Sequence, residues 1–136
     1  MTEAAWKGRG LVKGVAEGPA LISHKALSFL GDIDIRSGRV VGRSSDLYGE
    51  VVSGCVLVLP ETRGSAGAWR FVYQLKVHAT NPAALVLRDL PDPSVMQGAF
   101  LADLPILAAP EPAFWQMIAP GDLLRVDASS GWISKL

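Results

Sequence analysis

A serine and an arginine occupy one short loop of the chain, Arg63-Gly64-Ser65, directly after the apolar run at 54–60. Ligands of open α/β sheets bind beyond the carboxyl ends of strands, and a helix that starts there offers unpaired N–H groups and positive potential to an anion. The hydroxyl of Ser65 can meet a substrate at such a place, and the guanidinium of Arg63 can hold a carboxylate or a phosphate. The same residues also fit a simpler arrangement, in which Ser65 is the helix N-cap and Arg63 is solvated.

A second polar segment, Ser28-Phe29-Leu30-Gly31-Asp32, lies at the start of a stretch over 28–50 that has turn formers every few positions. This stretch has no helical period, so we expect a long ordered loop with a short strand in it. Ser28 can line a ligand site there. The alternative is a turn in which Asp32 accepts hydrogen bonds from its own backbone.

Residues that bind metals are scarce in this sequence. It has one cysteine, Cys55, and two histidines, His24 and His78, far apart along the chain. These residues cannot by themselves hold a structural zinc or an iron–sulfur cluster, so any metal must come from elsewhere. We expect Cys55 to be a small buried hydrophobe, and a lone cysteine fits a reducing compartment.

The residues around His24, Ser23-His24-Lys25-Ala26, are similar to the Ser-His-x-Ala of swivelling phosphohistidine domains. The glycine pair and the threonine that precede the histidine in those domains are missing here. We therefore expect His24 to stand at the end of a strand, and a phosphohistidine carrier is the less favoured alternative.

Breakers and apolar runs predict the elements that must position these residues. Spacings of three and four between Trp69, Val72, Tyr73, Lys76 and Val77 indicate an amphipathic helix after the serine loop. Asp92-Pro93 is typical of an N-cap followed by proline at the first helical position, and a further short helix begins at Glu111-Pro112. Strands are predicted at 10–14, 18–23, 54–60, 84–87, 105–108, 122–127 and 132–134. The fold class is therefore α/β, with β-rich N- and C-terminal parts around a β-α-β-α-β centre.

Composition limits the kind of partner. The chain has 136 residues, 49% of them hydrophobic, which is enough for the core of one domain. Thirteen Lys and Arg balance thirteen Asp and Glu, so no long-range field gathers nucleic acid or an anionic membrane. The start has no signal-peptide pattern and no apolar run reaches the length of a membrane helix. We expect a cytoplasmic protein with no nucleic acid or membrane partner.

Several motifs, in order and at the right separations, resemble the small swivel subunit of aconitase X. They are Gly18-Pro19-Ala20-Leu21-Ile22-Ser23, Ser28-Phe29-Leu30-Gly31-Asp32, Ser37-Gly38-Arg39-Val40-Val41, Leu47-Tyr48-Gly49, Arg63-Gly64-Ser65-Ala66-Gly67 and Asn81-Pro82-Ala83-Ala84. The resemblance runs from about residue 10 to 133. Three positions depart from the family pattern, since the family has Trp in place of Leu30, Gly in place of Asp32 and Ser in place of Ala66.

The resemblance implies a single aconitase X swivel-type domain over residues 1–136, with a swivelling β/β/α fold. It implies a large catalytic subunit as partner, which holds an iron or iron–sulfur centre, while this chain alone binds no cofactor. It further implies dehydration of a small hydroxy acid. We expect cis-3-hydroxy-L-proline as the substrate, because the Ala-rich composition with few lysines is not typical of a hyperthermophile. The alternative is conversion of mevalonate 5-phosphate to trans-anhydromevalonate 5-phosphate.

By the same resemblance Ser65 is the catalytic base, Arg63 and Gly64 contact the substrate, and Ser28 lines the cleft that faces the large subunit. A serine hydroxyl is a poor base in water, so it must be held close to an alkoxide by the helix N-terminus, neighbouring N–H groups and Arg63. This works only once the partner closes the site, so we expect the isolated chain to be inactive. A non-catalytic binding or scaffold module on the same fold is the alternative from another class.

Overall fold

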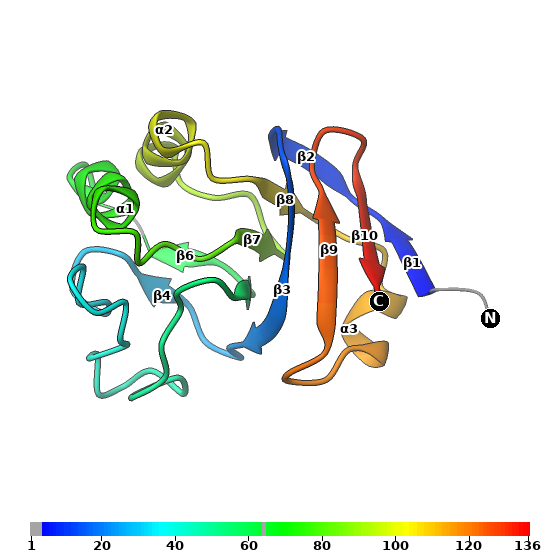
Figure 1. Ribbon diagram of the computed structural model, residues 1–136, viewed down its shortest axis with the longest axis horizontal. Helices are drawn as coiled ribbons and strands as arrows, with labels where there is room; N and C mark the ends of the chain where they lie inside the picture. Colours follow the sequence, from blue (N-terminus) through cyan, green and yellow to red (C-terminus); the bar gives the residue numbers. More distant parts are fainter. Residues whose placement is uncertain (1–3, 64) are drawn as a thin grey trace.

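The apolar run at 54–60 forms β5, one of four parallel strands in an eight-stranded sheet (Figure 1). The structure is a computed structural model that describes residues 4–63 and 65–136. The order across the sheet is β1-β10-β9-β3-β5-β7-β8-β2, in which β3, β5, β7 and β8 run parallel and all other neighbours pair antiparallel. The strands of this sheet are β1 (Ala4–Lys7), β2 (Arg9–Val12), β3 (Val15–Ile22), β5 (Val56–Leu59), β7 (Ala84–Leu87), β8 (Ile106–Ala108), β9 (Leu123–Asp127) and β10 (Trp132–Lys135).

Three helices and a small second sheet complete the fold. The helices are α1 (Ala68–Val77), α2 (Pro93–Ala102) and α3 (Ala113–Met117), and the second sheet pairs β4 (Leu27–Ser28) with β6 (Thr62–Arg63). The predicted β-α-β-α-β centre is confirmed by β5, α1, β7, α2 and β8. The predicted strands at 10–14 and 18–23 form β2 and β3, which pair with different neighbours and not with each other. None of the helices in the described residues is long and apolar enough to cross a membrane.

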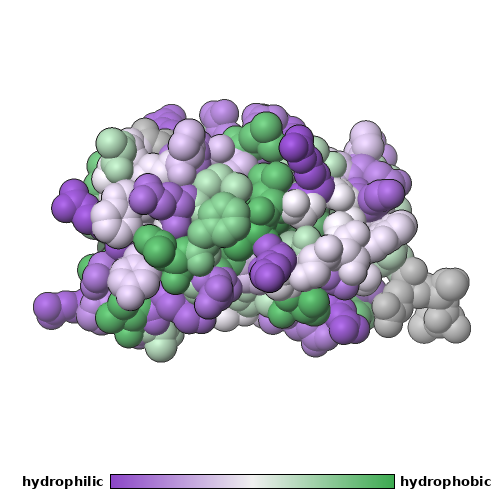
Figure 2. Space-filling model, turned by 90° about the horizontal axis from the view of Figure 1, so that it is seen from above, coloured by the Kyte–Doolittle hydropathy of each residue, from purple (hydrophilic) through white to green (hydrophobic). Residues whose placement is uncertain are grey.

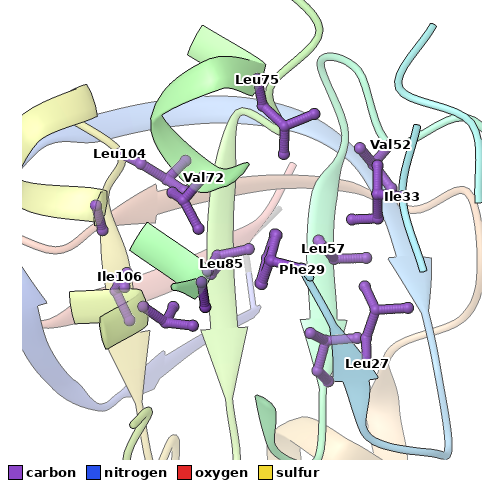
Figure 3. Packing of buried hydrophobic residues seen from close by; sticks show 14 of the residues in the cluster. Leu27, Phe29, Ile33, Val52, Leu57, Val72, Leu75, Leu85, Leu104 and Ile106 are labelled. Atoms are coloured by element: carbon purple, nitrogen blue, oxygen red, sulfur yellow. The ribbon is translucent and has the colours of Figure 1, made fainter. Parts of the chain in front are cut away.

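Three of the parallel strands, β5, β7 and β8, bury both of their faces, as continuous apolar runs do in sheets that are covered on both sides, whereas β3 keeps exposed residues. Alternate residues of β5 and β7 belong to two separate clusters. Leu57 and Leu85 point into the cluster under α1 and α2, and Val58 and Val86 point into the cluster on the face of α3. Figure 3 shows the first cluster filling the space between the sheet and the helices, with Phe29 from the long loop among its members. The loop over 29–55 is therefore anchored in the core.

Helix α1 buries a different stripe from the one that the sequence pattern indicated. Its buried residues are Ala68, Val72 and Leu75, whereas Tyr73 is 39% exposed and Val77 is 57% exposed. The prediction of a helix is right, but among the residues of its pattern only Val72 is buried. The inner face of α1 is instead completed by Ala68 and Leu75, which belong to the same core cluster as Val72.

Glycine allows α1 and α2 to lie close together. A Cβ placed on Gly98 of α2 would lie 2.8 Å from the Trp69 carbonyl oxygen and 2.8 Å from the Val72 Cβ of α1. Such separations are shorter than van der Waals contact, so no other residue fits between these helices without moving them. The close approach fixes the first turn of α1 against α2.

Apolar side chains also remain on the outer sides of both helices, among them Phe100 at 58% and Leu101 at 53% exposure. Figure 2 views the molecule from above and shows apolar surface near the centre of this face, interrupted by hydrophilic side chains. Cys55 is half-buried in the turn before β5, so the prediction of full burial within the strand is wrong. Burial, followed by the charge of Glu50, raises the pKa of the Cys55 thiol.

Candidate functional site

Ser65 lies in the loop between β6 and α1, where its side chain is exposed to solvent. The Ser65 carbonyl accepts a hydrogen bond of 3.0 Å from the N–H of Ala68. The N-cap of α1 is Gly67, which has no side chain to accept a capping bond, so the alternative of Ser65 as N-cap is wrong. Among residues 4–63 and 65–136, the Ser65 hydroxyl has no hydrogen-bond partner. Gly64, which the resemblance places at the substrate, lies outside the described residues.

The small sheet brings the two candidate segments together. Strands β4 and β6 pair in parallel with Ser28 opposite Arg63, so the Ser28 segment lies beside the chain that leads into the Ser65 loop. The Ser28–Asp32 turn is confirmed as well: the Asp32 carboxylate accepts the Ser28 N–H at 2.9 Å, and the Ser28 hydroxyl accepts the Leu30 N–H at 3.2 Å. The structure thus gives this segment a turn and places it beside Arg63, although Ser28 is not among the residues that line the hollow at Ser65.

The Ser65 loop borders a shallow hollow of about 500 Å³ between the starts of α1 and α2. Its lining residues are Ser65, Ala66, Asp92, Pro93, Ser94 and Gln97. Asp92 is the N-cap of α2 with Pro93 at the first helical position, as the sequence predicts. No local sequence pattern connects this cap to Ser65, because the two segments lie far apart along the chain.

The N–H groups at the start of α1 are mostly satisfied inside the protein. The Trp69 N–H donates to the Ser94 hydroxyl of α2 at 2.9 Å. Within the described part of the chain, the N–H groups of Ala66 and Gly67 have no acceptor. The expected donors for an anion are therefore found in the loop before α1 more than in the helix itself.

Two arginines flank the loop. Arg63 is exposed, and the guanidinium of Arg70 lies over Gly67, with Nη2 3.2 Å from the place of a Cβ on that glycine. In the described residues, neither arginine has a carboxylate within ion-pair distance. Arg70 was missed by sequence analysis, although its place three residues after Gly67, one helical turn on, is the signal that could have found it.

His24 lines a different hollow, of about 540 Å³, beyond the ends of β3, β5 and β7. Its lining residues are Ile22, Ser23, His24, Pro60, Arg88, Trp115, Ile118, Ala119 and Pro120. The carboxylate of Asp46 accepts the Ser23 hydroxyl at 2.5 Å and the His24 N–H at 2.8 Å. His24 follows the end of β3, as predicted, and is exposed.

The described residues do not form a site for an iron or iron–sulfur centre. No three side chains of His, Cys, Asp or Glu converge anywhere in residues 4–63 and 65–136. Such centres are held by several thiolate, imidazole or carboxylate groups together. This part of the chain therefore supplies no ligand set for the metal that the resemblance implies.

Fold and sequence together identify the class of protein. The sequence profile of the aconitase X swivel domain matches residues 5–135, so the chain belongs to the aconitase X swivel domain family. The aconitase X of Thermococcus kodakaraensis, solved in its holo-form, superposes with a TM-score of 0.90 at 34% identity and covers 98% of both chains. The predicted family and the predicted α/β swivel-type fold are confirmed.

Curated relatives specify the class further. The phosphomevalonate dehydratase small subunit of Methanococcoides burtonii is 37% identical over 92% of this chain and 90% of its own length. The protein of the same name from Pyrococcus furiosus is 35% identical over 92% of this chain and 90% of its own length. Relatives of this kind confirm the predicted class, a hydro-lyase subunit, and favour the alternative substrate over cis-3-hydroxy-L-proline.

Proposed function

We propose that this chain is the small subunit of a two-subunit phosphomevalonate dehydratase, with Ser65 as its catalytic base. The observation that carries the proposal is the exposed Ser65 hydroxyl, unbonded within the described residues, in a loop flanked by two arginines. The curated relatives support mevalonate 5-phosphate as the substrate. The composition argument for hydroxyproline is weaker, because relatives with the phosphomevalonate name cover nearly the whole chain.

The chemistry assigned to Ser65 is removal of a proton from the carbon next to the carboxylate of mevalonate 5-phosphate. The electrons of that C–H bond form the new carbon–carbon double bond, and the hydroxyl on the neighbouring carbon leaves as water. A base in this position contributes about 10²- to 10⁴-fold to the rate. Ser65 would act as an alkoxide, since a neutral hydroxyl is too weak a base for a proton on carbon.

The surroundings of Ser65 favour an anion. The N–H groups of Ala66 and Gly67, which directly follow Ser65, have no acceptor in the described chain, and Arg63 and Arg70 bring positive charge to both sides of the loop. In the isolated chain water screens these charges, because Ser65 is exposed. When a partner excludes the water, the same charges act more strongly on the alkoxide.

A large subunit is the partner that this proposal requires. Departure of the substrate hydroxyl needs an acidic group, and the described residues offer no metal ligand set to provide one. We assign the iron centre to the large subunit, where it would supply that Lewis acid. This chain contributes the base, and the hollow beside Ser65 would face the partner.

Arg63 and Arg70 are the groups of this chain best suited to hold the substrate anions. A guanidinium binds phosphate or carboxylate through two parallel hydrogen bonds, and neither arginine is engaged by a carboxylate within the described residues. A phosphorylated substrate has two anionic ends, and a pair of arginines matches that charge better than it matches zwitterionic hydroxyproline.

The test is to purify this chain together with the large subunit of the same organism and to assay both substrates. We expect dehydration of mevalonate 5-phosphate by the complex, no turnover by this chain alone, and loss of activity with Ser65→Ala. Ser44→Ala is the matched control, because Ser44 is also an exposed loop serine. Dehydration of cis-3-hydroxy-L-proline alone would overturn the substrate. An intact complex that is inert with both, or fully active as Ser65→Ala, would point to a binding or scaffold module.

A further inference from the structure

The loop that contains Ser65 is held in place by hydrogen bonds to the first turn of α2. We propose that Ser94 is a positioning residue that places Ser65 for the proton transfer. This inference rests on the proposed function, because it gives Ser94 a role only if Ser65 is the base.

Ser94 makes two hydrogen bonds to the turn that follows Ser65. Its hydroxyl accepts the N–H of Trp69 at 2.9 Å and donates to the carbonyl of Ala66 at 3.2 Å. A serine hydroxyl has one proton and two lone pairs, so both bonds can exist at once. The same oxygen atom of Ser94 therefore holds both Ala66, the residue directly after Ser65, and Trp69 in the first turn of α1.

The other side of the loop is fixed by Asp92. One carboxylate oxygen of Asp92 accepts the hydroxyl of Thr62 in β6 at 3.0 Å. Its other oxygen accepts the N–H groups of Ser94 and Val95, both at 3.1 Å, and so caps α2. The start of α2 thus contacts the chain before Ser65, at Thr62, and after it, at Ala66.

An ordinary cap from within α1 would satisfy the Trp69 N–H equally well. Serine or aspartate at the N-cap position, where this chain has Gly67, would form that bond locally. The bond is made instead by Ser94, 25 residues further along the chain. The position of the loop is therefore tied to α2, and the close approach at Gly98 sets how far apart α1 and α2 lie.

Ser65 has little else to hold it. Its side chain is exposed and unbonded in the described chain, and its carbonyl bonds only to Ala68 in the adjoining turn. Because a displacement of about 1 Å at a reacting group can reduce the rate about a hundredfold, loosening this loop affects the chemical step. We expect the loss to appear in kcat and not in KM.

The experiment compares Ser94→Ala, Ser94→Thr and Ser129→Ala in the complex with the large subunit, using mevalonate 5-phosphate. Ser129 is the matched control, because its hydroxyl also accepts a backbone N–H from a distant segment, that of Gly14, at 3.0 Å. We expect Ser94→Ala to lower kcat about tenfold or more with KM nearly unchanged. Ser94→Thr keeps the hydroxyl and restores most of kcat, and Ser129→Ala lowers thermal stability without lowering kcat.

A double-mutant cycle separates this inference from the proposed function. If Ser94 acts through Ser65, adding Ser94→Ala to Ser65→Ala causes no further loss of activity. Equal kcat values for Ser94→Ala and Ser129→Ala overturn the positioning role while leaving Ser65 as the base. An active Ser65→Ala complex overturns the proposed function itself. If Ser94→Ala does not assemble, Ser94→Cys takes its place, and a wild-type kcat for that variant overturns the role.

Discussion

Two hollows near the carboxyl ends of the parallel strands each contain a candidate serine, and the two serines differ in how their hydroxyls are bonded. The hollow beside His24 is on the side of α3, and its serine and backbone amide are already bonded to Asp46. The hollow beside Ser65 lies against α1 and α2, and in the described residues its serine hydroxyl is unbonded. The hollow beside His24 has the larger volume and contains a histidine, but neither feature identifies it as the functional site. An unbonded hydroxyl among positive charges is the better sign of chemistry.

The largest expected effect contrasts the two hollows directly. Ser65→Ala in the complex should lower kcat for mevalonate 5-phosphate by about 10²- to 10⁴-fold, the usual contribution of a positioned base. His24→Ala should leave kcat within about twofold, because the backbone N–H of His24, which binds Asp46, survives the change. Steady-state kinetics of both variants measures the contrast. A larger loss for His24→Ala than for Ser65→Ala would reverse the assignment of the two hollows.

Gly98→Ala tests whether α2 must lie close to α1 beneath the Ser65 loop. An alanine in a helix interior normally stabilises by about 1 kcal/mol over glycine. Here the added Cβ meets the Trp69 carbonyl and the Val72 side chain, so we expect a loss of about 1–3 kcal/mol and a lower Tm. Thermal unfolding is the measurement, with Gln97→Ala on the exposed side of α2 as control. A raised Tm for Gly98→Ala would mean that the helices have room between them.

Arg63→Gln tests the role of the positive charge beside the unbonded Ser65 hydroxyl. Loss of a two-bond contact to an anion should raise KM for mevalonate 5-phosphate about tenfold, with a smaller effect on kcat. Arg9→Gln is the control, because Arg9 is an exposed arginine on β2, an edge strand of the eight-stranded sheet that does not contain Arg63. Kinetics at several substrate concentrations separates KM from kcat. An unchanged KM would remove Arg63 from the binding site.

The smallest expected effect concerns Asp46, which binds Ser23 and His24 at the other hollow. Burial raises the pKa of Asp46, but hydrogen bonds from Ser23 and His24 outweigh it and hold the pKa below its ordinary value of 3.8. A carboxylate with a lowered pKa stabilises the fold above its unfolded pKa, and this stability is lost as the pH falls through the folded pKa. Asp46→Asn should therefore be less stable than wild type at pH 7, and the difference should be smaller at pH 3. Urea unfolding at both pH values measures the difference, and an equal difference at both would contradict the account.

The features that the sequence could predict are those that depend on residues close together along the chain. The Asp92-Pro93 cap and the buried strands β5 and β7 depend on neighbouring residues, and they were predicted correctly. The bond between Ser94 and Trp69 crosses 25 residues, so no local pattern reveals it. The pairing of β4 with β6 was missed because each strand has only two residues.

The same reason explains which candidate site residues the sequence could reveal. Ser65, Arg63 and Ser28 were found from motifs, and the structure brings Ser28 and Arg63 into register. Arg70 was missed because an arginine on an exposed helix face looks like any solvated residue. Arg70 is a candidate because its guanidinium lies over Gly67, and only the folded helix shows that position.

The central claim is that Ser65 exchanges a proton with the carbon next to the substrate carboxylate. The most direct measurement is deuterium incorporation at that carbon when the complex, with mevalonate 5-phosphate, is held at equilibrium in D₂O. We expect incorporation by the wild-type complex and a loss of at least about 10²-fold with Ser65→Ala, while substrate binding by calorimetry persists. Incorporation at the wild-type rate by Ser65→Ala would contradict this claim.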